Sequence, residues 1–362
     1  MYHKGQEKPA RIDAHPIWSI SDIQPPKISM AEARELAFRL YGVSEELSPL
    51  PSERDQIFRV PDTTSQQYVL RISGSGEQVS TLNFQNRALI EIQKEDPSLP
   101  VPKLCPSVRG RYLEQFRSKL DRFAVRLLTF VPGVPILNRR RSFELYRDIG
   151  SSLARLNRAL VGLTAPPKNP NLLWDIRRAT RLRPLLVHLS QYKKRNLVEA
   201  VFDELDRHIF KRLETLRSQV IHNDFNPKNI LIDLAAPDRV SGIIDFGDLT
   251  YSPRVVDLGV AIARNIELTD TLPAACELVA GYHSVLPLSD EEISILFDLV
   301  CTRLALRAVV WSWRHSKEDP RCDPNQISLA INLLETLSSA GKERVTAIFR
   351  AACGADRPRW RA

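Results

Sequence analysis

The chain has 362 residues, of which 43% are hydrophobic and 26% are charged, a balance typical of one or two globular domains. Its net charge of +8 allows an anionic partner such as a nucleotide, but basic and acidic residues are interspersed, which favours a solvated basic surface over a nucleic-acid site. Five scattered cysteines without a C-x-x-C pair indicate neither a zinc site nor disulfides. The lack of a signal-like or membrane-spanning apolar run predicts a cytoplasmic protein without a membrane segment.

The N-terminal region predicts an arm followed by a helix. Residues 1–27 are polar and predict a flexible N-terminal arm. Ser29 and Glu32 have the spacing of a capping box, which marks the start of a helix. Gly42 is the kind of residue that ends one.

A strand-rich segment follows this helix. The runs "QIFRV" at 56–60 and "QYVLRI" at 67–72 are separated by turn-forming residues and predict a hairpin. Residues 82–92 are helical in composition, and "RFAVRLLTF" at 122–130 predicts a further strand. The Pro/Gly segment "VPGVP" at 131–135 is a candidate hinge, with a nucleotide expected in the cleft beneath it.

Beyond the hinge, the pattern is mostly helical. Apolar residues at helical spacing predict helices over 142–160, 172–189 and 196–216. Ser289 and Glu292 form a second capping box, ahead of another apolar stripe. The sequence therefore predicts an α+β protein with two lobes.

The predicted lobes differ in size and composition. A small, β-rich N-terminal lobe is expected over 28–130, and it would face the phosphates of a nucleotide. A larger, helical C-terminal lobe is expected over 131–362, and it would carry the catalytic and metal-binding loops.

Polar residues gather between apolar runs in "VIHNDFNPKNILID", residues 220–233, and again in "VSGIIDFGD", residues 240–248. The apolar parts predict an antiparallel hairpin. Since the start of one strand then lies beside the end of the other, Asn229 and Asp245 should share an edge. Asp224 precedes Asn229 by five residues and can arch over that edge.

Two carboxylates and an amide at one place form a pocket of hard oxygen ligands. Such ligands suit Mg²⁺ bound together with the phosphates of a nucleotide. One carboxylate can remain free to orient a substrate hydroxyl and accept its proton. This division of labour is the one used in phosphoryl transfer by kinases.

The runs "HNDFNPKN" and "IIDFGD" resemble the catalytic and metal-binding loops of the aminoglycoside phosphotransferase family, whose fold is protein-kinase-like. The family pattern is H-x-D-x-x-x-x-N, an apolar strand pair and then D. The resemblance implies that Asp224 is the catalytic base, that Asn229 and Asp245 bind Mg²⁺, and that ATP or GTP is the donor.

Further segments extend the resemblance over roughly residues 30–310 and are most similar to the hydroxylysine kinase branch of the family. They are "LPSERDQIFRV", "QYVLRIS", "RLLTFVPGVPI", "NLLWDIRRA" and "GIIDFGDLTYSPRVVDLGVAIA". The resemblance implies a small-molecule kinase whose acceptor is an amine or amino acid with a hydroxyl. The best single candidate is 5-hydroxylysine, and aminoglycosides remain open.

The sequence departs from the family at the phosphate-binding positions. Arg71 replaces the usual lysine, and Asn83 or Gln85 replaces its glutamate partner. No Gly-rich loop is present in "SPLPSERDQ", where Ser52 and backbone amides are candidate phosphate donors. Lys228 could touch the γ-phosphate or be solvated. The missing pair leaves a nucleotide-binding regulatory pseudokinase as an alternative.

Candidate substrate contacts are less defined. Asp175 could hold a substrate ammonium or form an ion pair with Arg177 or Arg178 on its own helix. The arginines of this helix could meet a substrate carboxylate or form a basic helix face. Asp248 is expected either behind the metal ligands or beside the metal, and Asp257 is expected to anchor the catalytic loop.

Overall fold

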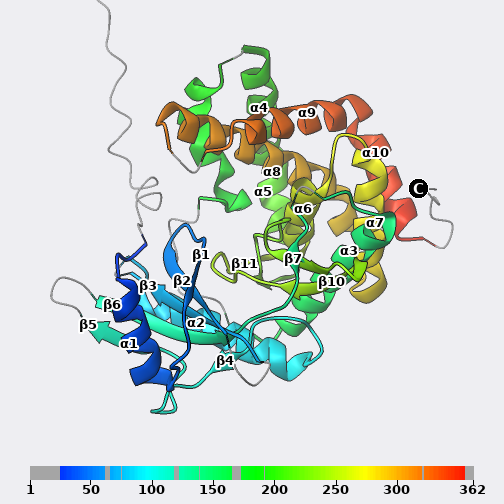
Figure 1. Cartoon of the computed structure of the whole chain (residues 1–362). Coiled ribbons are helices and arrows are strands. Elements are labelled where there is room, and N and C mark those ends of the chain that lie inside the picture. Colours follow the sequence, from blue (N-terminus) through cyan, green and yellow to red (C-terminus); the bar gives the residue numbers. More distant parts are fainter. Residues whose placement is uncertain are drawn as a thin grey trace, which may run out of the picture.

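The computed structural model describes residues 25–354 with short gaps, which are residues 62–65, 75, 118–121, 138, 165–172, 191 and 320–321. The predicted arm thus lies outside the described residues up to position 24. The described chain combines a sheet-rich part with a larger helical part, as Figure 1 shows. The predicted combination of a β-rich part and a helical part is confirmed. The boundaries 28–130 and 131–362 stay a prediction.

An antiparallel sheet forms the framework of the N-terminal part. Its central order is β1-β2-β3-β6-β4, and β5 also pairs with β6. The strands are β1 (Ser48–Leu50), β2 (Asp55–Val60), β3 (Tyr68–Ser73), β4 (Leu104–Cys105), β5 (Glu114–Arg117) and β6 (Arg122–Thr129). The predicted hairpin is β2 with β3, in which Phe58 lies opposite Leu70.

Helix α1 (Met30–Tyr41) packs against this sheet. Its capping box forms as predicted, because Ser29 and Glu32 exchange hydrogen bonds, and Gly42 ends it in the left-handed conformation at φ +70°. Its apolar face and the sheet share a small core. The core residues include Ala33, Leu36, Leu40, Phe58, Leu70, Ile72, Val125 and Leu127.

Helix α2 (Val79–Glu95) contributes instead to the large core of the helical part. Its buried residues Phe84, Leu89 and Ile92 belong to the same cluster as residues of the C-terminal helices. The segment after β6 continues into β7 (Val134–Pro135), which pairs with β9 in a different sheet. The predicted hinge segment therefore connects two sheets.

Helices and two small sheets make up the C-terminal part. The helices are α3 (Phe143–Ala159), α4 (Tyr192–Glu204), α5 (Phe210–Leu213), α6 (Arg254–Asn265), α7 (Thr271–Val285), α8 (Asp290–Ser316), α9 (Asn325–Ala340) and α10 (Lys342–Ala352). The strands are β8 (Ser218–Ile221), β9 (Ile230–Asp233), β10 (Ala236–Ile243) and β11 (Thr250–Pro253), which pair as β10-β9-β7 and β11-β8.

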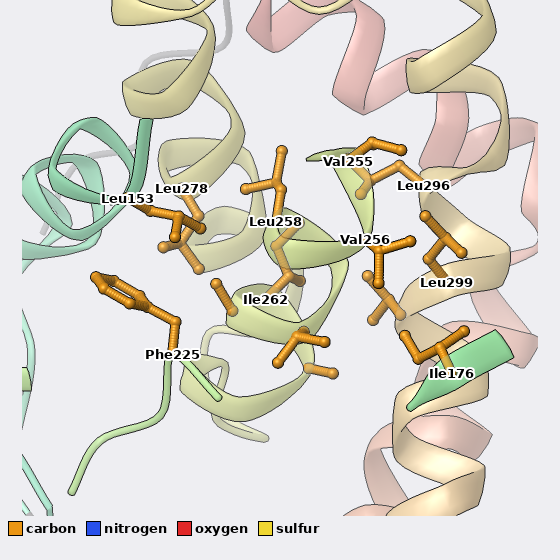
Figure 2. Packing of buried hydrophobic residues seen from close by; sticks show 14 of the residues in the cluster. Leu153, Ile176, Phe225, Val255, Val256, Leu258, Ile262, Leu278, Leu296 and Leu299 are labelled. Carbon is orange, nitrogen blue, oxygen red and sulfur yellow. The ribbon is translucent and has the colours of Figure 1, made fainter. Parts of the chain in front are cut away.

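Helix α6 lies at the centre of the large core. Figure 2 shows Leu258 and Ile262 of this helix among side chains from α3, α7 and α8. Since nearly every residue of α6 is buried, side chains that project from it are held on a rigid support. Among the helices that the structure describes, none combines the length and the apolar character needed to cross a membrane.

The predicted helix over 172–189 differs in type from an ordinary α-helix. The structure has a 3₁₀ helix, η3 (Ile176–His188), which contains Pro184. In an α-helix interior, proline clashes with the carbonyl four residues earlier and costs about 3 kcal/mol, so the tighter geometry has a physical reason. The predicted helix over 196–216 is interrupted by a π-helical turn, η4 (Leu205–Ile209), between α4 and α5.

Candidate active site

The polar loop between β8 and β9 is anchored by a buried carboxylate of α6. Both oxygens of Asp257 accept backbone N–H groups, from His222 at 3.0 Å and from Asn223 at 2.7 Å. Asn157 of α3 donates a third bond at 2.7 Å. Burial raises the pKa of Asp257, although these contacts favour its charged form. The position of Asp257 agrees with the predicted anchoring role.

Two other features fix the shape of this loop. Asn265, at the end of α6, donates from its side chain to the carbonyl of Phe225 at 2.9 Å. Asn223 has a positive φ of 65°, a left-handed conformation that asparagine tolerates better than most residues. The loop is therefore tied to α6 on both sides of Asp224.

Asp224 is held by the loop's own asparagines. Its Oδ2 accepts from Asn226 at 2.8 Å and from Asn229 at 3.1 Å, and its Oδ1 faces Arg303 at 3.4 Å. One quarter of the side chain is exposed. Burial and the charge of Asp248 raise the pKa of Asp224, whereas Arg303 lowers it. The carboxylate is thus fixed in orientation but open to a small molecule.

The strand pair brings Asn229 and Asp245 together as predicted. Ile230 lies opposite Ile243, and the N–H of Ile244 donates to the carbonyl of Asn229 at 2.9 Å. Asp245 follows directly with a positive φ of 63°, and its side chain is half exposed. The two side chains therefore leave the same sheet edge.

The donor atoms at this edge fit a hard divalent cation. The Asn229 amide nitrogen bonds to Asp224, which leaves the amide oxygen without a hydrogen bond among the described residues. Burial would raise the pKa of Asp245, but the charges of Arg71 and Arg54 outweigh burial and hold that pKa below its ordinary value. An ionised carboxylate and an amide oxygen are ligands that suit Mg²⁺.

Arg71 of β3 has a different partner from the one usual in kinases. Its Nε donates to the buried carboxylate of Asp55 in the adjacent strand, and its Nη1 lies 3.9 Å from Asp245. Gln85 of α2 accepts a bond from Arg126 at 3.0 Å instead. The predicted absence of an ion pair between Arg71 and α2 agrees with these contacts, and Asp55 supplies the counter-charge.

Arg54 is a site residue that sequence reasoning missed. It lies in the loop between β1 and β2, and its Nη1 donates to Asp248 at 3.3 Å. This ion pair connects the sheet-rich part to the loop after Asp245. The signal available in the sequence was an arginine within "SPLPSERDQ", the segment that replaces the Gly-rich loop. Ser52 of this loop is exposed, and its Oγ accepts the N–H of Asp55 at 3.3 Å.

The remaining candidates have local hydrogen-bond partners. Lys228 is exposed, and its backbone N–H donates to Asn226 at 2.8 Å. Asp175 caps η3 by accepting the N–H of Arg177 at 3.0 Å, and its other oxygen pairs with the Arg177 side chain at 3.0 Å. Arg178 lies 3.6 Å from the same carboxylate. The oxygens of Asp175 are thus engaged within its own helix.

Comparisons with known proteins agree with this geometry. A profile of the "Phosphotransferase enzyme family" matches residues 46–291. Mouse (Mus musculus) hydroxylysine kinase is 29% identical over 318 residues, which cover 81% of this chain and 84% of the relative.

Solved structures show the same fold at low sequence identity. An amicoumacin kinase in complex with AMP-PNP and Ca²⁺ has a TM-score of 0.63 at 15% identity, with 85% of this chain and 92% of the other covered. A microcompartment-associated aminopropanol kinase has a TM-score of 0.62 at 20% identity, with 89% and 98% covered. These neighbours confirm the predicted kinase-like architecture.

Proposed function

This chain belongs to the phosphotransferase enzyme family, and we propose that its acceptor is a small molecule that carries both a hydroxyl and an amino group. As a kinase-type enzyme, it phosphorylates the hydroxyl group. The best single candidate is 5-hydroxylysine, because hydroxylysine kinases are relatives over most of the chain. The donor that we propose is ATP or GTP bound with Mg²⁺.

One observation carries this proposal. Asp224 is oriented by hydrogen bonds from Asn226 and Asn229, and it remains one quarter exposed beside the edge that carries Asp245. A carboxylate in this arrangement can accept a hydrogen bond from an acceptor hydroxyl that lies next to the donor phosphates. Positioning of this kind is the main protein contribution to phosphoryl transfer.

The proposed reaction is an in-line transfer. The acceptor hydroxyl donates a hydrogen bond to Asp224 and passes its proton to that carboxylate as its oxygen bonds to the γ-phosphorus. The bond from the γ-phosphorus to the β–γ bridging oxygen breaks, and the nucleoside diphosphate leaves. Asn229 and Asp245 would hold Mg²⁺, which offsets the charge of the β- and γ-phosphates when bound.

We also propose roles on the donor side of the site. Arg71 and Arg54 extend from the sheet-rich part, and their positive charges act on Asp245. They are suited to contact phosphate oxygens together with Ser52 and the backbone of its loop. Lys228 is the proposed additional contact to the γ-phosphate.

The test is a turnover assay with ATP and with GTP on a panel of hydroxylated amines that includes 5-hydroxylysine and an aminoglycoside. We expect Asp224→Asn to lower kcat by about 100-fold or more, because it removes the proton acceptor. Asp233→Asn is the matched control, since Asp233 is an exposed carboxylate at the end of β9. Unchanged kcat in Asp224→Asn would refute the role assigned to Asp224. Turnover of the aminoglycoside but not of 5-hydroxylysine would refute 5-hydroxylysine as the acceptor.

A further inference from the structure

Three arginines of α6 and α8 form a cluster beside the candidate base and are not explained by the proposed phosphoryl transfer. The charges of Arg303 and Arg264 act on Asp224, and the charges of both act on Arg307. Arg303 and Arg307 are one helical turn apart on α8, and only 2% and 4% of their surfaces are exposed. Arg264 projects from α6, which packs against α8. The Nε atoms of all three are buried without a hydrogen-bond partner in the described part of the chain.

Direct ion pairs within the described residues do not match the positive charge of this cluster. Arg303 lies 3.4 Å from Asp224, a carboxylate already bonded to two asparagines. Arg307 donates to the neutral side chain of Gln326. Arg264 has no carboxylate within ion-pair distance in the described ranges. Among the described residues, Asp224 is the carboxylate within ion-pair distance of the cluster, and the charges of Asp175, Asp248 and Asp323 act on it from farther away.

Neighbouring carboxylates are committed to other partners. Asp248 pairs with Arg54 at 3.3 Å, and Asp175 pairs with Arg177 at 3.0 Å. Burial and the charges of Arg264 and Arg303 lower the pKa of Arg307, and the charge of Asp323 opposes them. The direction of the shift reflects a buried positive charge, which a bound anion would stabilise.

The cluster is separate from the arginines on the donor side. The charges that act on Arg71 are those of Asp55, Asp245 and Glu77, which belong to the sheet and the metal-binding edge. The charges of Asp224, Asp248 and Asp175 act on Arg303, and Asp224 is the one within ion-pair distance. An anion held by the cluster would therefore lie beside the candidate base, where the acceptor is expected.

We propose that Arg264, Arg303 and Arg307 bind the carboxylate of an amino-acid acceptor whose hydroxyl faces Asp224. This inference rests on the proposed function, and it restricts the acceptors to those with a carboxylate. The planar guanidinium matches a carboxylate with two parallel hydrogen bonds, and the Nε–H group of each arginine in the cluster has no partner among the described residues. The arginines of η3, the other candidates for this contact, include Arg177, which is engaged by Asp175.

The experiment compares ligands that differ only in the carboxylate. Turnover is measured for 5-hydroxylysine and for 1,5-diaminopentan-2-ol, which is the same molecule without its carboxyl group. Binding is measured calorimetrically for L-lysine and cadaverine, which lack the hydroxyl and cannot be phosphorylated. We expect the wild type to favour the carboxylate member of each pair by about 30-fold or more.

Two variants locate the effect in the cluster. Arg307→Gln and Arg264→Gln lie on different helices, and each is expected to reduce the carboxylate preference by about 10-fold or more, with little change for the decarboxylated ligand. Arg109→Gln removes an equal charge from an exposed position of the sheet-rich part and should retain the preference. The wild-type comparison decides the question even when a variant does not fold.

The outcomes separate this inference from the proposed function. Equal turnover of 5-hydroxylysine and its decarboxylated analogue overturns the inference and leaves the kinase proposal standing. Lysine binding that Arg307→Gln weakens, without turnover of any amine, upholds the carboxylate site and refutes the proposed acceptor. The inference is also overturned if L-lysine and cadaverine bind equally well.

Discussion

Helices α3 and α7 pack backbone to backbone at Gly150 and Gly281. A Cβ atom added to Gly281 would lie 2.0 Å from the carbonyl oxygen of Arg147. A Cβ atom at Gly150 would lie 2.1 Å from the carbonyl oxygen of Leu278. Because ordinary contact begins at 3.4 Å, a Gly281→Ala substitution has to open the crossing by about 1.4 Å.

The energetic cost follows from two opposing effects. Overpacking costs about 1–3 kcal/mol, and the upper end applies here because a backbone carbonyl cannot rotate aside. Replacing glycine by alanine within a helix returns about 1 kcal/mol. We therefore expect Gly281→Ala to lower the free energy of unfolding by about 2 kcal/mol.

The same opening should reach the candidate catalytic loop. Tyr282 of α7 donates to Asn157 of α3 at 2.8 Å, and Asn157 donates to Asp257 at 2.7 Å. Loss of one buried hydrogen bond in this series costs about 1–1.5 kcal/mol. We expect kcat/KM to fall by about 10-fold if that energy appears in the transition state.

Urea unfolding and steady-state kinetics test this prediction. Gly162→Ala is the matched control, because its added Cβ would find its nearest neighbour, Glu91 Oε1, at an ordinary 3.5 Å. Wild-type stability in Gly281→Ala would show that the crossing is not as tight as described. Lower stability with unchanged kcat/KM would refute the coupling to the loop.

Two further predictions concern ion pairs. Asp55→Asn removes the buried counter-charge of Arg71, and we expect the KM for the nucleotide to rise by about 10-fold. An unchanged KM would count against a role of Arg71 at the phosphates. Arg155 lowers the pKa of Asp96 to about 2, so the pair stabilises the fold above pH 4 and this stability is lost as the pH falls towards 2. Arg155→Gln should therefore cost up to about 2 kcal/mol in urea unfolding at pH 7, and a loss that does not shrink below pH 4 would contradict this assignment.

Local patterns account for the parts of the fold that could be predicted. The capping boxes at Ser29 and Ser289 form as expected, because their hydrogen bonds join residues only three apart. The edge that joins Asn229 and Asp245 was also predictable, since it depends on a short antiparallel pair. The type of η3 was not predicted, because apolar spacing alone does not distinguish a 3₁₀ helix from an α-helix, although Pro184 is visible in the sequence.

Contacts between distant residues could not be predicted. Arg54 and Asp248 are 194 residues apart, and Arg303 and Asp224 are 79 apart. Arginine is common on surfaces, so the letter alone does not distinguish a buried guanidinium from a solvated one. For this reason the sequence indicated the arginines beside Asp175 as candidates, whereas the cluster near Asp224 comes from α6 and α8.

The two sides of the candidate site rest on different supports. Asp257 and Asn265 tie the loop of Asp224 to α6, whose side chains form the centre of the large core (Figure 2). The strands behind Arg71 share a separate, smaller core with α1. The acceptor side is therefore supported by the main core, while the strand of Arg71 is supported mainly by the smaller one. Under the proposed function, acceptor selection therefore belongs to the rigid helical part, and the ion pair between Arg54 and Asp248 aligns the donor phosphates with it.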